Sequence, residues 1–198
     1  MNHLATSKED ILAASRDLIK ENGWAAVSIR AVASRCSVSA GTIYNYYESK
    51  ADLLSDTIES IWHEIFFHPE DEQVFHDVES CISWIYERLE YGNRQFPGFF
   101  SLHSFGFMRD EKTSGKKRMM KTWGHILNGL CEVLGNDPKV RTDVFDQEFT
   151  EKKFADILFS LILVSMIRQD YDPSSVLMLV KKTLYVTVQS QAKFQKQV

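Results

Sequence analysis

Three helical patterns, each opened by a serine, follow one another between residues 28 and 54, and this arrangement restricts the fold more than any other feature of the chain. Ser28, Ser39 and Ser49 stand at N-cap positions, where a serine hydroxyl accepts a hydrogen bond from a backbone N–H of the first turn. Between the first two patterns, around Ser37, there is room only for a tight break. The spacing predicts a helix-turn-helix followed directly by a longer helix.

A supporting helix is predicted in front of this motif, from Thr6 to Asn22, because the apolar residues there recur with helical spacing. Thr6 and Glu9 stand at the spacing of a capping box, so we expect the helix to begin with them. Gly23 follows the last turn and can adopt the positive φ that ends many helices. The first part of the chain is therefore expected to be a three-helix domain.

The remainder of the chain also has helical spacing and no alternation of the strand type. The long helix that begins after Ser49 is expected to end before Pro69. Apolar spacing then predicts helices over residues 71–91, 97–108 and 115–134. The predicted fold class is all-α.

Two further helices are expected at the C-terminal end, the first from Glu148 to Arg168. The second begins at Pro173, with Asp172 as its cap, and continues to about Gln191. Together they carry apolar residues that a solvent-exposed helix would not have: Phe154, Ile157, Leu158, Leu161, Ile162, Met166, Val176, Leu177, Val180, Leu184 and Val188. A symmetric four-helix interface would bury them, so we expect a homodimer through the last two helices.

Composition favours a globular protein of the cytoplasm. Hydrophobic residues make up 44% and charged residues 25% of the 198 positions, which is ordinary for such proteins. Cys36, Cys81 and Cys131 form no CxxC pair, which fits free thiols in a reducing compartment, and the chain begins with no signal-peptide pattern. The longest apolar run, residues 157–167, is shorter than the ~20 residues that cross a bilayer, so no membrane association is expected.

The charge is unevenly distributed along the chain. A net charge of −4 is unfavourable for a nucleic-acid partner when the chain is taken as a whole. Residues 1–54, however, contain six basic and six acidic residues, so the excess of acid lies outside the predicted helix-turn-helix. The charge balance therefore leaves nucleic-acid binding by the first domain open.

The second helix of the motif has an apolar face and a polar face. At 100° per residue, Ile43 and Tyr47 point inward. The outward face carries small and polar groups suited to base edges and phosphates, namely Gly41, Thr42, Tyr44, Asn45 and Tyr46. Lys50, in the first turn of the next helix, can bind a phosphate together with the free backbone N–H groups there, and Arg30 can reach the opposite strand. This face is expected to lie in the major groove of DNA.

The stretch SIRAVASRCSVSAGTIYNYYESKADLL, from Ser28 to Leu54, closely resembles the DNA-binding domain of the tetracycline repressor (TetR) family. The resemblance covers about the first 55 residues, including ILAASRDLIKENGW, and beyond them it extends only to length and helical layout. Carried over by position, it implies DNA contacts by Arg30, Thr42, Tyr44, Asn45, Tyr46 and Lys50. Ser37 departs from the family, which usually has glycine in this turn, where a serine would be slightly strained.

The resemblance also implies a division of labour along the chain. Residues 1–54 are expected to form the DNA-binding domain and residues 55–198 a helical effector-binding and dimerisation domain. The implied function is a transcriptional regulator that represses by binding a palindromic operator on double-stranded DNA and is released by a small, largely apolar effector. No enzymatic activity and no cofactor are expected.

An effector pocket implied by the resemblance would lie in the C-terminal domain, mainly among the helices predicted at 71–91, 97–108 and 115–134 and the helix before them. Aromatic side chains suit an apolar cavity, and the candidates are Trp62, Phe66, Trp84, Phe99, Phe100, His103, Phe107 and Trp123. The same side chains at helical spacing also fit a packed core, so this alternative stays open. His63 and His68 are five residues apart and no HExxH motif occurs, so no metal site is expected.

Two other classes of function remain as alternatives. An enzyme with an incidental helix-turn-helix would need an active site, but the sequence has no nucleophile elbow, no phosphate-cradling glycine loop and no metal-ligand cluster. A DNA-binding regulator that responds to a protein partner, or to nothing, is compatible with the sequence. A closed apolar cavity would favour the regulator that responds to a small molecule.

Overall fold

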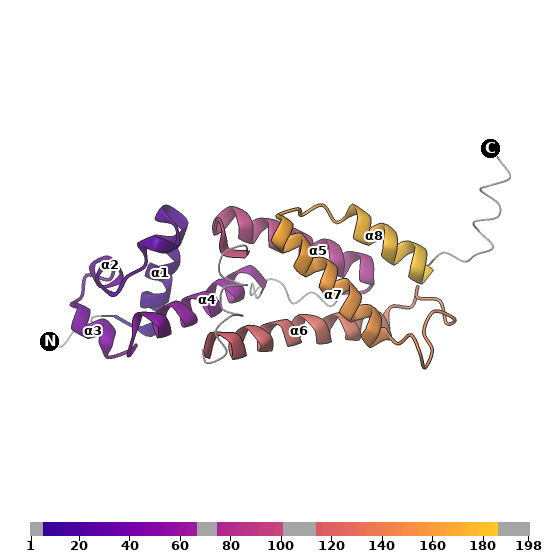
Figure 1. Cartoon of the computed structure of the whole chain (residues 1–198), viewed down its shortest axis with the longest axis horizontal. Coiled ribbons are helices and arrows are strands. Elements are labelled where there is room, and N and C mark those ends of the chain that lie inside the picture. Colours follow the sequence, from indigo (N-terminus) through magenta and orange to yellow (C-terminus); the bar gives the residue numbers. More distant parts are fainter. Residues whose placement is uncertain (1–5, 67–74, 101–113, 186–198) are drawn as a thin grey trace. The chain divides into compact units, whose positions relative to one another are not determined.

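The computed structural model describes residues 6–66, 75–100 and 114–185, and every regular element in these ranges is helical (Figure 1). The helices are α1 (Lys8–Asn22), α2 (Ile29–Arg35), α3 (Ala40–Tyr44), α4 (Lys50–Phe66), α5 (Val78–Gln95), α6 (Ser114–Asn136), α7 (Glu151–Arg168) and α8 (Ser174–Val180). The predicted all-α fold class is confirmed. The chain forms two compact units: Met1–Asp71 with Tyr91–Met120, and Glu72–Glu90 with Lys121–Val198. The predicted domain boundary after residue 54 stays a prediction.

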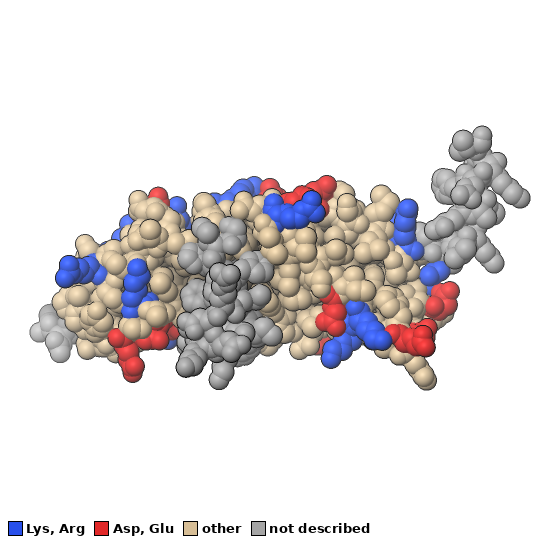
Figure 2. All heavy atoms as spheres, viewed as in Figure 1, with Lys and Arg blue, Asp and Glu red and all other residues tan. Residues whose placement is uncertain are grey.

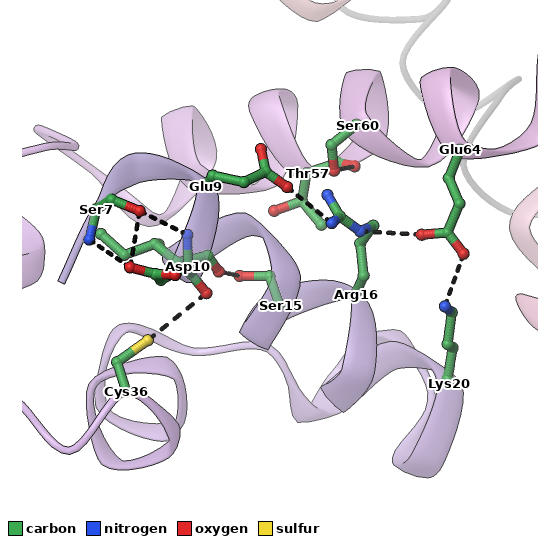
Figure 3. A network of polar contacts seen from close by, with 11 residues as sticks. Ser7, Glu9, Asp10, Ser15, Arg16, Lys20, Cys36, Thr57, Ser60 and Glu64 are labelled. Atoms are coloured by element: carbon green, nitrogen blue, oxygen red, sulfur yellow. Dashed lines mark hydrogen bonds and ion pairs between the residues drawn. The ribbon is translucent and has the colours of Figure 1, made fainter. Parts of the chain in front are cut away.

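Helix α1 begins one residue later than predicted. The Ser7 hydroxyl accepts a hydrogen bond from the Asp10 N–H at 3.1 Å, and the Asp10 carboxylate accepts one from the Ser7 N–H at 2.8 Å. The predicted capping box of Thr6 and Glu9 is therefore wrong, although both pairs have the required spacing. The Glu9 carboxylate instead accepts a hydrogen bond from Arg16 at 2.9 Å, on the side of α1 that faces α4 (Figure 3).

The helix-turn-helix forms as the serine caps predict. The Ser28 hydroxyl accepts a hydrogen bond from the Ala31 N–H at 3.1 Å, and the Ser39 hydroxyl accepts one from the Thr42 N–H at 3.2 Å. Ser37 lies in the turn with φ +56°, a conformation that costs a non-glycine residue ~1–2 kcal/mol. The expectation that this serine is strained is confirmed, and the rest of the motif must compensate for it.

Helix α4 packs along α1. Ser49 caps it as predicted, accepting a hydrogen bond from the Asp52 N–H at 3.2 Å. Near its other end, the Glu64 carboxylate binds Arg16 at 3.0 Å and Lys20 at 2.7 Å, both of which come from α1 (Figure 3). These partly buried ion pairs join the C-terminal end of α4 to the supporting helix.

In the second unit, polar turn residues move two helix starts away from the predicted positions. Helix α5 begins at Val78 rather than residue 71, because the Asp77 carboxylate accepts a hydrogen bond from the Ser80 N–H at 2.8 Å. Helix α7 begins after its cap Thr150 rather than at Glu148. The N–H of Glu148 is bonded to the Asp146 carboxylate at 2.8 Å in a turn, so it is not available to the helix.

The C-terminal part of the described chain is fastened by one buried carboxylate. Asp137, 6% exposed, accepts hydrogen bonds from the Val78 N–H at 3.0 Å and the Tyr185 hydroxyl at 2.6 Å. It thereby ties the start of α5 to the π-helical turn Lys181–Tyr185 that follows α8. The sequence pattern predicted one helix from Pro173 to about Gln191, but the α-helical part ends at Val180; residues 186–198 and most of the predicted helix at 97–108 lie outside the described residues.

Candidate nucleic-acid interface

The outward face of α3 is the one that the sequence predicts. Ile43 and Tyr47 are buried, with 0% and 4% of their surface exposed, and hold α3 against the rest of the motif. Tyr44 is 55% exposed, and Asn45 beside it is also exposed. The packing leaves a polar face of α3 open for a partner, and DNA contact by these residues stays a prediction.

The hydroxyl groups on this face differ in how much freedom they have. The Thr42 and Ser39 hydroxyl oxygens are 3.0 Å apart and share a hydrogen bond, which orients Thr42. The Tyr46 hydroxyl donates to the carbonyl of Thr6 at 2.7 Å, so on DNA it can serve only as an acceptor unless that bond breaks. In the described residues no hydrogen bond ties the side chains of Tyr44 and Asn45, which leaves both available to base edges.

Gly41 is not required by the packing of α3. A Cβ atom built there would meet only the Ser39 hydroxyl oxygen, at an ordinary contact distance of 3.6 Å, and no positive φ is present. Glycine inside a helix costs up to about 1 kcal/mol relative to alanine. The protein therefore carries a destabilising residue at a surface position, as expected where another molecule approaches the backbone closely.

The basic residues of the first 54 positions fall into two groups. Four are neutralised internally: Lys8 pairs with Asp56 at 2.6 Å, Arg35 pairs with Glu21, and both Arg16 and Lys20 pair with Glu64. Arg30 and Lys50 are exposed and form no ion pair with the described residues. Arg30 lies in the first turn of α2 and Lys50 in the first turn of α4.

These two cations, which form no ion pair with the described residues, flank α3 along the chain, and Lys and Arg side chains are visible on the surface near α2 (Figure 2). A free cation on each side of an exposed polar helix matches the arrangement in which phosphate contacts position a helix in the groove between them. The sequence alone could not separate these two cations from the other four basic residues, because ion pairs become visible only in the structure.

Four of the predicted effector residues come together in the first unit. The Trp62 ring lies 5.7 Å from Phe66, 5.3 Å from Phe99 and 5.6 Å from Phe100, measured between ring centroids. Trp24 stacks on Phe99 at 5.7 Å with 10° between the planes. We call these five residues the aromatic cluster. Through Trp24 it touches the short turn Trp24–Ala26 that precedes α2.

The other predicted effector residues are placed differently. In the second unit, Trp84 packs against Phe75 at 5.2 Å and Trp123 against Phe159 at 5.8 Å. His103 and Phe107 lie outside the described residues. In the described part of the chain no three His, Cys, Asp or Glu side chains gather as a metal site would require.

The predicted dimerisation residues are of two kinds. Most are core residues of the second unit and are buried within the single chain: Phe154, Leu158, Ile162, Met166, Val176, Val180 and Leu184. Leu161 and Leu177 are half-buried, and Val188 lies outside the described residues. The sequence reading mixed core and surface because α7 and α8 are apolar on more than one side.

The large apolar side chains that α7 and α8 leave exposed include one member of that set, Ile157 at 43%. The others are Val164, Ile167, Met178 and Leu179, exposed by 44%, 51%, 57% and 38%. An apolar surface of this kind on two helices is typical of a face that meets another protein chain. We call these five residues the apolar face of α7 and α8.

Comparison with known proteins relates this architecture to bacterial regulators. Residues 11–57 match the family described as bacterial regulatory proteins, tetR family. The HTH-type transcriptional regulator UidR of Escherichia coli K12 is 38% identical over 48 residues, which are 24% of each chain. The chain thus matches about a quarter of the length of this curated relative.

Solved structures share the fold over nearly the whole chain. A transcriptional regulator from Rhodococcus sp. Rha1 has a TM-score of 0.66 at 18% identity, covering 92% of this chain and all of that one. Reduced NemR of Escherichia coli reaches 0.64 at 17% identity over 91% and 99% of the chains. FadR of Bacillus subtilis, solved with stearoyl-CoA, reaches 0.58 at 18% identity over 88% and 97%.

The capped α2–α3 pair and its exposed polar face define a helix-turn-helix protein, and the remaining described elements are helical. The segment that matches the tetR family of bacterial regulatory proteins, residues 11–57, is the one that contains the helix-turn-helix. No helix in the described residues is long and apolar enough to cross a membrane.

Proposed function

We propose that the protein is a DNA-binding transcriptional repressor that leaves a palindromic operator when a small, largely apolar effector binds. Two exposed cations support DNA binding most strongly. Arg30 and Lys50 form no ion pair with the described residues, and they lie before and after α3 along the chain. The other four basic residues of the first 54 positions form ion pairs with carboxylates of the chain itself.

The residues of this interface have different roles in the proposal. Asn45 and Tyr44 read base edges, because their side chains are exposed and carry donors and acceptors without partners in the described chain. Lys50 and Arg30 bind phosphates and set the register of α3 in the groove. The hydroxyl oxygens of Thr42 and Tyr46 contact the same DNA backbone. Because operator DNA lies in the cytoplasm of bacteria, the proposal puts the protein there.

A homodimer provides the second copy of α3 that a palindrome needs. The apolar face of α7 and α8 supports this part of the proposal, since its exposed side chains gain free energy when a second copy covers them. The two copies of α3 in the dimer must then stand ~34–36 Å apart to enter successive major grooves. An effector that changes this separation releases the protein.

The aromatic cluster supports effector control. FadR of Bacillus subtilis, which shares the fold, was solved with stearoyl-CoA, so this architecture can hold a molecule that carries a long apolar chain. In the present chain the cluster includes a residue from the segment that joins α1 to α2, because Trp24, two residues after α1, stacks on Phe99. An effector can release DNA only if it binds the released state more tightly than the DNA-bound state.

The experiment that tests DNA binding compares two arginines of the same helix. An operator selected from random DNA is titrated with wild type, Arg30→Ala and Arg35→Ala, the last being the control because Glu21 already neutralises Arg35. We expect Arg30→Ala to weaken binding about tenfold or more and to reduce the salt slope by about one unit, and Arg35→Ala to leave both nearly unchanged.

Base reading is tested separately with Asn45→Ala, which should lose more affinity for the operator than for random DNA. Equal losses for Arg30→Ala and Arg35→Ala would contradict the assignment of the unpaired cations. Failure to select any DNA sequence would contradict DNA binding itself.

A further inference from the structure

Helix α4 carries three buried or half-buried hydroxyl groups, and one of them differs from the others. The Thr57 hydroxyl donates to the carbonyl of Leu53 at 2.7 Å, and the Ser60 hydroxyl donates to the carbonyl of Thr57 at 2.8 Å. Ser55 is 5% exposed, yet its hydroxyl oxygen has no hydrogen-bond partner among the described residues. A serine in a helix usually satisfies itself through the preceding turn, as Ser60 does, so the free Ser55 hydroxyl requires an explanation.

A second buried polar atom on α4 lacks a partner. Trp62 is 2% exposed, and its indole N–H meets no acceptor in the part of the chain that the structure describes. Around it are the rings of Phe66, Phe99 and Phe100, which offer only apolar surface and weakly attractive ring faces. Buried tryptophan N–H groups usually find a partner, and one that does not costs ~1–3 kcal/mol.

The two atoms lie on one side of the helix. Seven residues separate Ser55 from Trp62, which is two helical turns, so both side chains point the same way about 10 Å apart along the axis. Thr57, Ser60 and Glu64 define the other side, which faces α1 (Figure 3). The ion pairs between α4 and α1 therefore lie on the side of α4 away from Ser55 and Trp62.

We infer that Trp62 is the polar anchor of the effector site and that the effector is a neutral, flat, apolar molecule that presents a hydrogen-bond acceptor, such as a ketone oxygen, to the indole N–H. A second polar atom at its far end meets the Ser55 hydroxyl. The inference rests on the proposed effector control and specifies the class of effector.

The surroundings of the anchor select a neutral acceptor. The Lys20 ammonium lies 5.0 Å from the centroid of Phe96, a ring next to Phe99, and it is already paired with Glu64 at 2.7 Å. An ionised carboxylate placed among Phe66, Phe99 and Phe100 would lose its hydration there and would have to compete with Glu64 for this ammonium. A neutral carbonyl loses much less hydration free energy, and the hydrogen bond from the Trp62 N–H offsets that loss.

Two probes of the same shape isolate the hydrogen bond. 2-Acetylnaphthalene has a ketone oxygen where 2-ethylnaphthalene has only hydrogen, and equilibrium dialysis measures the binding of each to the full-length protein. We expect the wild type to bind the ketone about tenfold more tightly, the size of one hydrogen bond that also relieves a buried donor. In Trp62→Phe, which keeps an aromatic ring but lacks the N–H, this preference should disappear or reverse toward the hydrocarbon.

Ser55 is tested with 2-acetyl-6-methoxynaphthalene, which carries a second acceptor at the far end of the same ring system. Ser55→Ala should weaken this probe several-fold and leave 2-acetylnaphthalene unchanged. Ser60→Ala is the matched control, because its hydroxyl is on the same helix but already bonded, and it should change neither probe. Thermal unfolding of each variant checks that the fold is retained.

A ketone preference that survives in Trp62→Phe would overturn the inference, because another group would then supply the donor. Failure of both naphthalenes to bind the wild type up to their solubility limits would also overturn it. Neither result bears on the comparison of Arg30→Ala with Arg35→Ala, which is made without any effector and judges DNA binding separately.

Discussion

The reading head (α1–α4) and the helices α7 and α8 present opposite surfaces to their surroundings. The head buries its apolar residues, pairs four of its cations internally and exposes a polar helix between Arg30 and Lys50. Helices α7 and α8 are also well packed, yet they leave the apolar face exposed. Each region therefore leaves one surface that its own packing does not cover, polar on the head and apolar on α7 and α8. Under the proposed function the polar surface binds DNA and the apolar face binds a second copy of the chain.

The largest expected effect concerns the apolar face. Changing Ile167 and Met178 to Asp puts charges on side chains that are 51% and 57% exposed in the single chain, so the protomer should fold normally. In a dimer both charges would be buried without partners, and the dimer dissociation constant should rise by about a thousandfold or more. Analytical ultracentrifugation across a range of protein concentrations measures the change.

Two controls make this prediction specific. Lys152→Asp places the same charge on an exposed position of α7 outside the apolar face and should leave the dimer intact. Leu184→Asp introduces the charge at a fully buried position and should unfold the second unit instead of dissociating it. If the double variant Ile167→Asp/Met178→Asp still sediments as a dimer, the apolar face of α7 and α8 is not the dimer interface.

The next largest expected effect concerns Gly41, on the exposed face of α3. Gly41→Ala should raise the free energy of unfolding by ~0.5–1 kcal/mol, because alanine favours the helix and its Cβ meets nothing closer than 3.6 Å. The same methyl group should weaken operator binding about tenfold, since it occupies the space through which the DNA backbone approaches. Denaturant unfolding and operator titration on one protein preparation test both parts.

Opposite signs for stability and affinity are the signature of a surface position kept for binding. Ala31→Gly, in the neighbouring helix α2, is the reverse change at a position not assigned to DNA, and it should lower stability with little effect on affinity. A Gly41→Ala protein that binds the operator as well as the wild type would show that DNA does not approach here.

The same contrast explains how far the sequence could predict the structure. In the head, helix starts are set by local side chains: the Ser28, Ser39 and Ser49 caps were all found, and the one error, at α1, came from two overlapping capping boxes of equal spacing. In the second unit the starts depend on Asp77 and Asp146, whose turns the apolar pattern does not report.

Contacts between distant segments were beyond prediction for the same reason. The stacking of Trp24 on Phe99 joins residues 75 positions apart in a geometry that no periodicity encodes. The unsatisfied N–H of Trp62 became visible only once its neighbours were placed. Likewise, the sequence identified six cations in the first 54 residues, but only the structure separates the four paired ones from Arg30 and Lys50.

The smallest expected effect concerns the ion pair that closes the second unit. The Lys139 ammonium lies 2.6 Å from the Asp77 carboxylate, and hydrogen bonds from Lys139 and Ser80 lower the pKa of Asp77 from 3.8 to about 2. A carboxylate with a depressed pKa contributes stability that is fully present above its unfolded pKa and is lost as the pH falls through its folded pKa. The loss should therefore occur between about pH 4 and pH 2.

The size of this effect is limited by solvent, because Lys139 is 58% exposed and Asp77 18% exposed. We expect about 1 kcal/mol, below the full value of the pKa shift, and less at high salt. Urea unfolding of the wild type and Asp77→Asn at pH 7 and pH 3 measures it: the wild type should lose about 1 kcal/mol more than the variant between the two pH values. Equal losses would show that the start of α5 is held by Asp137 alone, and that this end of the second unit does not depend on the surface pair.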